Sequence, residues 1–84
     1  MSMKRLNHID YYLTSDLAIA TTISLFYPLD CLDKTNPKRV QFIFKRSDGM
    51  DQFIEMYWKG EIKVNPLEYF QQLKFLKSRL YESR

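Results

Sequence analysis

The sequence predicts a small α+β domain with the element order β-α-β-β-α-α, in which a three-stranded, mostly antiparallel sheet is packed by helices. Short segments of period-two alternation indicate the strands, and apolar residues spaced by three and four indicate the helices. An apolar share of 45% with 15% aromatic residues is enough to build a core in 84 residues. We expect residues 8–84 to form a single domain and residues 1–7 to be a flexible N-terminus.

A strand and a helix open the domain. Residues 8–14 alternate with period two, which is typical of a half-buried strand. The hydroxyls of Thr14 and Ser15 can accept hydrogen bonds from a helix start, so we expect a helix over residues 16–27 that ends before Pro28. Its small side chains favour close packing onto the sheet over a helix-dimer seam. Its expected apolar side consists of Ile19, Ile23, Phe26 and Tyr27.

Two further strands are expected over residues 29–33 and 39–46, joined by a turn at residues 34–38. They are close enough along the chain to form a hairpin. The first strand reaches the second through a helix, so it would run parallel to the second and antiparallel to the third. A right-handed crossover then favours the order 2-3-1, with the third strand in the centre.

Two helices complete the predicted fold. Ser47 or Asp48 is the expected N-cap of the first, and Gly60 its stop, because glycine adopts the left-handed conformation at little cost. Asn65 followed by Pro66 is typical of a helix start, so the last helix is expected over residues 66–82. The apolar stripes of the two helices are Met50, Phe53, Ile54 and Tyr57, widened by Trp58, and Tyr69, Leu73, Leu76 and Leu80, beside Phe70.

Three groups of residues carry a resemblance. They are residues 12–18 (YLTSDLA), residues 33–40 with 42–44, and residues 57–60 continued through 64–66, 69–70, 73–74 and 76–81. In these residues the chain resembles a small uncharacterised domain family of bacteria, archaea and their viruses that is known only as a domain of unknown function. The shared motifs are caps, turns and apolar stripes. The resemblance therefore implies a complete one-domain protein and transfers no activity.

Several classes of protein are excluded by composition. A single cysteine, Cys31, cannot form an intramolecular disulfide, and with a single histidine, His8, we expect no metal site and no cofactor. No apolar run approaches the roughly 20 residues that span a bilayer, and signal-peptide anatomy is missing. We therefore expect a cytoplasmic protein without a membrane or small-molecule partner. The net charge of +3 permits a nucleic-acid or acidic-protein partner.

Basic residues gather in the predicted hairpin and in the last helix. A two-stranded ribbon with basic flanks can lie against phosphates, and a helix face with two lysines can extend that contact. A solvated turn and a solvated helix side explain the same residues more simply. The candidate nucleic-acid-binding residues are Lys34, Lys38, Arg39, Lys45, Arg46, Lys74 and Lys77.

An aromatic cluster in the last two helices is the second candidate. Tyr57 and Phe70 lie on the apolar stripes and are expected in the core. Trp58, Phe75 and Tyr81 are candidates for an interface, because Trp and Tyr suit surfaces with one dry and one wet side. A chain this short covers its apolar surface well by self-association, so we expect a homodimer.

The indications of an enzyme are weak. Residues 61–63 have the acid-x-Lys spacing of a nuclease metal site, but such three-residue matches arise often by chance. His8 lacks a nucleophile at a suggestive spacing, and Cys31 has no basic neighbour to lower its pKa. We therefore expect a non-enzymatic accessory module that binds nucleic acid through the hairpin and the last helix. The alternative is a protein–protein interaction domain, for dimerisation or as an adaptor, that uses the aromatic patch.

Overall fold

The computed structural model describes residues 10–82, and six elements follow one another in the predicted order. The sheet has the order β1-β3-β2, and both pairs are antiparallel. This is the predicted arrangement with the third strand central, so the fold prediction is confirmed. The elements are β1 (Tyr11–Thr14), α1 (Leu17–Ser24), β2 (Cys31–Asp33), β3 (Gln41–Lys45), α2 (Met50–Trp58) and α3 (Pro66–Tyr81).

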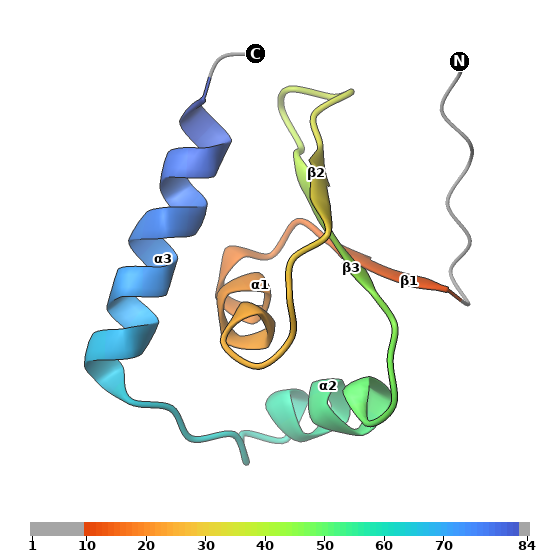
Figure 1. Ribbon diagram of the computed structural model, residues 1–84, viewed down its shortest axis with the longest axis vertical. Coiled ribbons are helices and arrows are strands. Elements are labelled where there is room, and N and C mark those ends of the chain that lie inside the picture. Colours follow the sequence, from red (N-terminus) through yellow and green to blue (C-terminus); the bar gives the residue numbers. More distant parts are fainter. Residues whose placement is uncertain (1–9, 83–84) are drawn as a thin grey trace.

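Helix α1 lies in the middle of the molecule, between the sheet and α3, while α2 crosses one end (Figure 1). Residues 19–23 of α1 are all buried. Because successive side chains point 100° apart around a helix, five consecutive buried residues mean that α1 is enclosed on every side. The turn between β2 and β3 and the last turn of α3 lie together at the end opposite α2 (Figure 1). This common end positions the candidate site.

The main core lies between the inner face of the sheet and the helices. It consists of Ile19, Ala20, Ile23, Phe42, Phe44, Met50 and Leu76. Tyr12 of β1 packs against this core, whereas Leu13 is the register partner of Ile43, which points to the opposite face of the sheet. Ile43 is only 2% exposed, so both faces of the central strand exclude water.

The first helix starts and ends differently from the prediction. Its N-cap is Asp16, whose carboxylate accepts hydrogen bonds from the backbone N–H groups of Ala18 (2.9 Å) and Ile19 (3.4 Å). The Thr14 hydroxyl instead accepts from the N–H of Asp16 itself. The helix ends at Ser24 rather than at residue 27, and Phe26 is exposed instead of lying on the buried side.

The second helix also has an unpredicted start. Its N-cap is Gly49 in the left-handed region (φ 86°), with no side-chain cap bond, so neither Ser47 nor Asp48 caps it. Gly60 (φ 74°) follows its end as predicted. The start of α3 is also confirmed: the Asn65 side chain accepts from the N–H groups of Leu67 (2.9 Å) and Glu68 (3.1 Å), and proline occupies the first turn.

The strands are shorter than predicted. β2 begins at Cys31 and β3 ends at Lys45. Residues 8 and 9 of the first predicted strand, His8 among them, lie outside the described residues. Among the helices of residues 10–82, none has the length and apolar character needed to cross a membrane.

Candidate nucleic-acid interface

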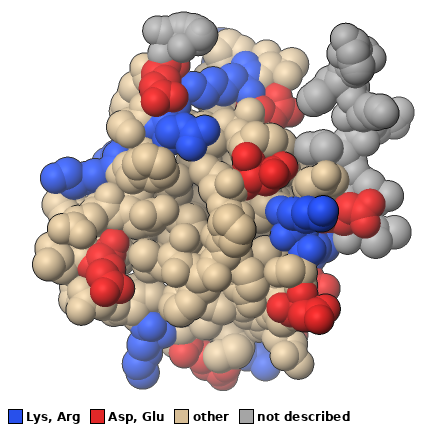
Figure 2. All heavy atoms as spheres, in the orientation of Figure 1, with Lys and Arg blue, Asp and Glu red and all other residues tan. Residues whose placement is uncertain are grey.

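The basic residues of the hairpin lie at its two opposite ends. Lys38 and Arg39 belong to the turn, whereas Lys45 and Arg46 follow at the far end of β3. Between them lies the extended strand β3 (Gln41–Lys45), which at about 3.3 Å per residue spans roughly 13 Å. On the face shown in Figure 2, Lys and Arg side chains stand in separate groups, with Asp and Glu side chains among them and a broad uncharged area in the centre. The hairpin therefore does not present its five cations as one patch.

Arg46 has structural contacts. Its guanidinium forms an ion pair with Asp51 in the first turn of α2 and lies 5.6 Å from the centre of the Tyr12 ring. The backbone N–H of Arg46 also donates to the carbonyl of Asp10 at 2.8 Å. These contacts tie the end of β3 to β1 and α2.

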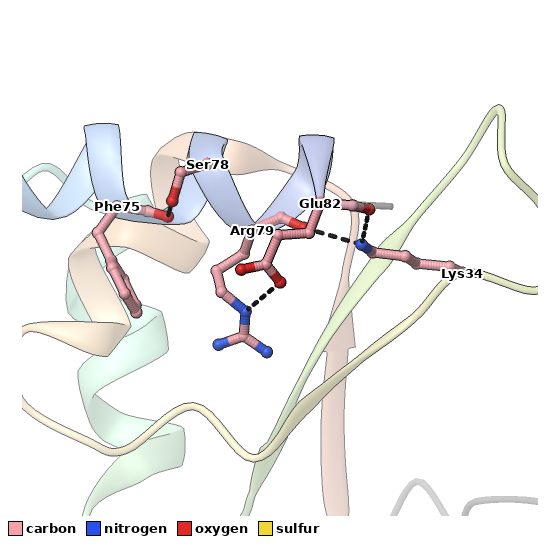
Figure 3. A network of polar contacts seen from close by, with 5 residues as sticks. All are labelled: Lys34, Phe75, Ser78, Arg79 and Glu82. Carbon is pink, nitrogen blue, oxygen red and sulfur yellow. Dashed lines mark hydrogen bonds and ion pairs between the residues drawn. The ribbon is translucent and has the colours of Figure 1, made fainter. Parts of the chain in front are cut away.

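Lys34 contacts the end of α3 (Figure 3). Its ammonium donates to the backbone carbonyl oxygens of Arg79 at 2.8 Å and Glu82 at 3.1 Å. Arg79 in turn lies 3.7 Å from the carboxylate of Glu82. The Lys34 ammonium therefore already has two hydrogen-bond acceptors within the protein. Its contact nevertheless holds the hairpin turn against the last turn of α3.

A pocket of about 400 Å³ lies where three segments meet. Its walls come from the hairpin turn (residues 37–40), the start of α1 and the end of α3, where Leu80 and Tyr81 border it. Leu17 and Phe42 give it an apolar lining. Lys38 and Arg39 also border the pocket, and neither side chain takes part in an ion pair with the described residues.

Ser15 also borders this pocket. Its hydroxyl oxygen is buried and has no hydrogen-bond partner among residues 10–82. A buried hydroxyl without a partner is unfavourable, because it loses its hydrogen bonds to water without replacement. The Asp16 carboxylate caps α1, so the neighbouring Ser15 hydroxyl does not serve as the cap.

The outer side of α3 continues from this pocket. Leu76 is fully buried, and the residues on the opposite side of the helix are exposed: Tyr81 to 81%, Leu67 to 64% and Phe70 to 55%. Lys74 and Lys77 are exposed on the same side by helical spacing, and Lys77 lies one turn before Tyr81. The prediction that Phe70 belongs to the core is therefore wrong, because it points away from Leu76.

The three predicted interface residues are exposed but separate. Trp58 is 63% exposed and packs edge-on against Tyr57, with ring centres 5.0 Å apart. Phe75 is 49% exposed and lies 6.0 Å from the guanidinium of Arg79. No ring contact within residues 10–82 joins Trp58, Phe75 and Tyr81. The structure therefore does not bring these three aromatic residues into one cluster.

Among residues 10–82, the acidic residues considered for a metal site do not gather into one. Within the described part of the chain, no group of three or more His, Cys, Asp and Glu residues could hold a metal ion. Partial burial raises the pKa of the Cys31 thiol above its usual value, and the nearby Asp30 carboxylate adds a smaller increase. A raised thiol pKa means less thiolate at neutral pH, which opposes a role as nucleophile.

Sequence reasoning missed the pocket. Ser15 was expected only as a helix cap, and the lining residues Leu17, Val40 and Leu80 are ordinary apolar members of predicted helices and a strand, so none was a candidate. Residues 15 and 81 line the same pocket because of how α1 packs on α3, which the sequence does not reveal. Gln72 on α3 donates to the Ser24 hydroxyl at the end of α1 (3.0 Å), and this bond helps to fix that packing.

The fold and its surface define a small α+β domain with one end formed by a basic turn, a mostly apolar pocket and an aromatic helix terminus. The chain belongs to a protein family described as Domain of unknown function (DUF5659), which matches residues 9–82. No curated protein and no solved structure is significantly similar to it.

Proposed function

We propose that this chain is a small, non-enzymatic cytoplasmic module that binds nucleic acid where the hairpin turn meets the end of α3. One observation carries the proposal: Lys38 and Arg39 border a pocket that the highly exposed Tyr81 also lines. Cations without ion-pair partners attract phosphates, and an exposed aromatic ring beside them can stack on a base. Lys74 and Lys77 extend the positive charge along α3.

The proposed surface is smaller than the one that the sequence suggested. Lys34 and Arg46 have partners within the protein, and Lys45 lies at the other end of β3. Four cations remain near α3 and the turn. Since each phosphate contact to a single strand contributes about −0.7 to the salt slope of log K, four contacts give a slope of roughly −3. Binding should therefore be weak at physiological salt and much stronger at low salt.

Fluorescence anisotropy with labelled DNA and RNA at several salt concentrations tests the proposal. The double variant Lys38→Glu/Arg39→Glu should abolish binding while its circular dichroism spectrum stays unchanged. Lys59→Glu/Lys63→Glu is the matched control, because it changes the net charge equally at exposed positions outside the pocket. This control should keep most of the affinity. Absence of binding by the wild type at low salt, or equal loss in both variants, would overturn the proposal.

A protein–protein interaction domain is the second candidate. The observation that favours it is the exposure of Trp58 and Phe75, since aromatic residues are enriched at protein–protein interfaces. If the partner is a second copy, light scattering should give a dimer mass that Trp58→Ser or Phe75→Ser reduces to that of a monomer. A monomer mass at every wild-type concentration would remove this self-association.

A further inference from the structure

Aromatic rings and ammonium groups alternate along the outer side of α3. The order is Phe70, Lys74, Lys77 and Tyr81, all on the side opposite the buried Leu76. The Lys74 ammonium lies 5.2 Å from the centre of the Phe70 ring. At 1.5 Å per residue, Phe70 and Tyr81 are about 16 Å apart along the helix axis. This stripe ends at the pocket, because Tyr81 belongs to both.

Alternating rings and cations fit a single strand better than a duplex. In a duplex the faces of the bases are stacked on one another and cannot reach Phe70 or Tyr81. A single strand offers free base faces to aromatic side chains and phosphates to the lysines between them. The spacing of the two rings leaves room for Lys74 and Lys77 to contact the intervening backbone.

The pocket at the end of the stripe suits one unstacked base. Its volume of about 400 Å³ lies within the range of small-molecule sites. Leu17 and Phe42 are apolar lining residues that can contact the faces of a base. Lys38 and Arg39 at the rim would lie near the phosphate of the same nucleotide.

A second copy of the chain is a less favourable occupant of this stripe. In a two-fold symmetric pairing, the same patch of each copy meets its equivalent. Lys74 and Lys77 lie symmetrically about the midpoint between Phe70 and Tyr81, so in an antiparallel pairing centred on the stripe the Lys74 ammonium would approach the Lys77 ammonium of the other copy. Like charges at that position disfavour the dimer, whereas an anionic strand removes the repulsion.

We infer that the chain binds single-stranded nucleic acid along the outer side of α3 and seats one base in the pocket beside the hairpin turn. Phe70 and Tyr81 stack on bases, Lys74 and Lys77 contact the backbone between them, and Lys38 and Arg39 hold the phosphate at the pocket. This inference rests on the proposed function and adds to it the form of the nucleic acid and its path.

The test compares labelled DNA and RNA single strands of about ten nucleotides with duplexes of the same sequence. The wild type should bind the single strands about tenfold more tightly. Tyr81→Leu and Phe70→Leu should each weaken single-strand binding about tenfold and leave duplex binding unchanged, as expected for the loss of one stacked base. The matched control Trp58→Leu removes an exposed aromatic residue outside the stripe and should change nothing.

The outcomes separate this inference from the proposed function. Equal affinity for single strands and duplexes, with a loss only in Lys38→Glu/Arg39→Glu, would overturn the single-strand path and keep the charged site. An effect of Trp58→Leu as large as that of Tyr81→Leu would also overturn the path. Absence of all binding at low salt would overturn both. The DNA and RNA arms show which sugar the site accepts.

Discussion

The ammonium of Lys34 donates a hydrogen bond of 2.8 Å to the backbone carbonyl oxygen of Arg79, 45 residues later in the chain. A second bond of 3.1 Å reaches the carbonyl of Glu82. The last carbonyls of a helix have no helical partner and form the negative end of its dipole, so a cation is favourable there. Lys34 therefore stabilises the end of α3 and sets the distance between the hairpin turn and Tyr81.

Replacing Lys34 by Met should destabilise the protein by about 1 kcal/mol, because two hydrogen bonds and a favourable charge at the helix end are lost. Chemical denaturation measures the change, and hydrogen exchange should show faster exchange in the last turn of α3. Lys38→Met is the control: its ammonium takes part in no ion pair within residues 10–82, so its free energy of unfolding should change by less than about 0.5 kcal/mol. Equal effects of the two substitutions would contradict the capping role.

Replacing Ser15 by Ala should stabilise the protein. The Ser15 hydroxyl is buried without a partner in the described structure, so its removal relieves a desolvation penalty of about 1 kcal/mol. Thr14→Ala is the control, because the Thr14 hydroxyl accepts a hydrogen bond from the N–H of Asp16 and its loss should be destabilising. A destabilised Ser15→Ala variant would show that the hydroxyl has a partner.

The parts of the fold that were predicted correctly depend on local signals. Asn65 and Pro66 start α3 and Gly60 follows α2, because each of these residues acts through its own backbone and its nearest neighbours. The same reasoning failed at the start of α1, because several neighbouring residues can act as its cap. Thr14, Ser15 and Asp16 can all cap a helix, and only the structure shows that the carboxylate does so.

The candidate site was only partly predictable for a different reason. Lys38 and Lys45 are close in sequence, but a strand is extended, so seven residues place them far apart. Ser15 and Tyr81 are remote in sequence, but the packing of α1 on α3 places them at one pocket. Basic residues that are close in sequence therefore need not form one patch when they lie on a strand. A patch formed by residues of different elements, in turn, is not visible in the sequence.

The Asp33 carboxylate should make stability depend on pH. Its pKa lies below the usual value of 3.8, because Thr35 donates to it from its side chain and from its backbone N–H (2.9 Å). A carboxyl with a lowered folded-state pKa stabilises the protein above its unfolded pKa, and this contribution is lost as the pH falls through the folded-state pKa.

The comparison of wild type with Asp33→Asn isolates this effect, because the other acidic groups titrate in both proteins. Urea unfolding at pH 6 should show the wild type as the more stable protein. The difference should shrink as the pH falls below about 3.8 and toward the still lower pKa of the folded state. A difference that stays constant over this range would mean that the charge of Asp33 does not contribute.

The two glycines should respond differently to substitution. Both have positive φ, 86° at Gly49 and 74° at Gly60, so Ala at either position should cost about 1 kcal/mol for backbone strain. Asn tolerates this conformation better than Ala. At Gly60 an added Cβ meets no atom within 4 Å, so Gly60→Asn should be less destabilising than Gly60→Ala. At Gly49 the Tyr27 hydroxyl lies 3.4 Å from an added Cβ and opposes a longer side chain, so Asn should give no such advantage.

Chemical denaturation of the four variants measures this contrast, and an equal benefit of Asn at both positions would show that the Tyr27 hydroxyl moves aside without cost.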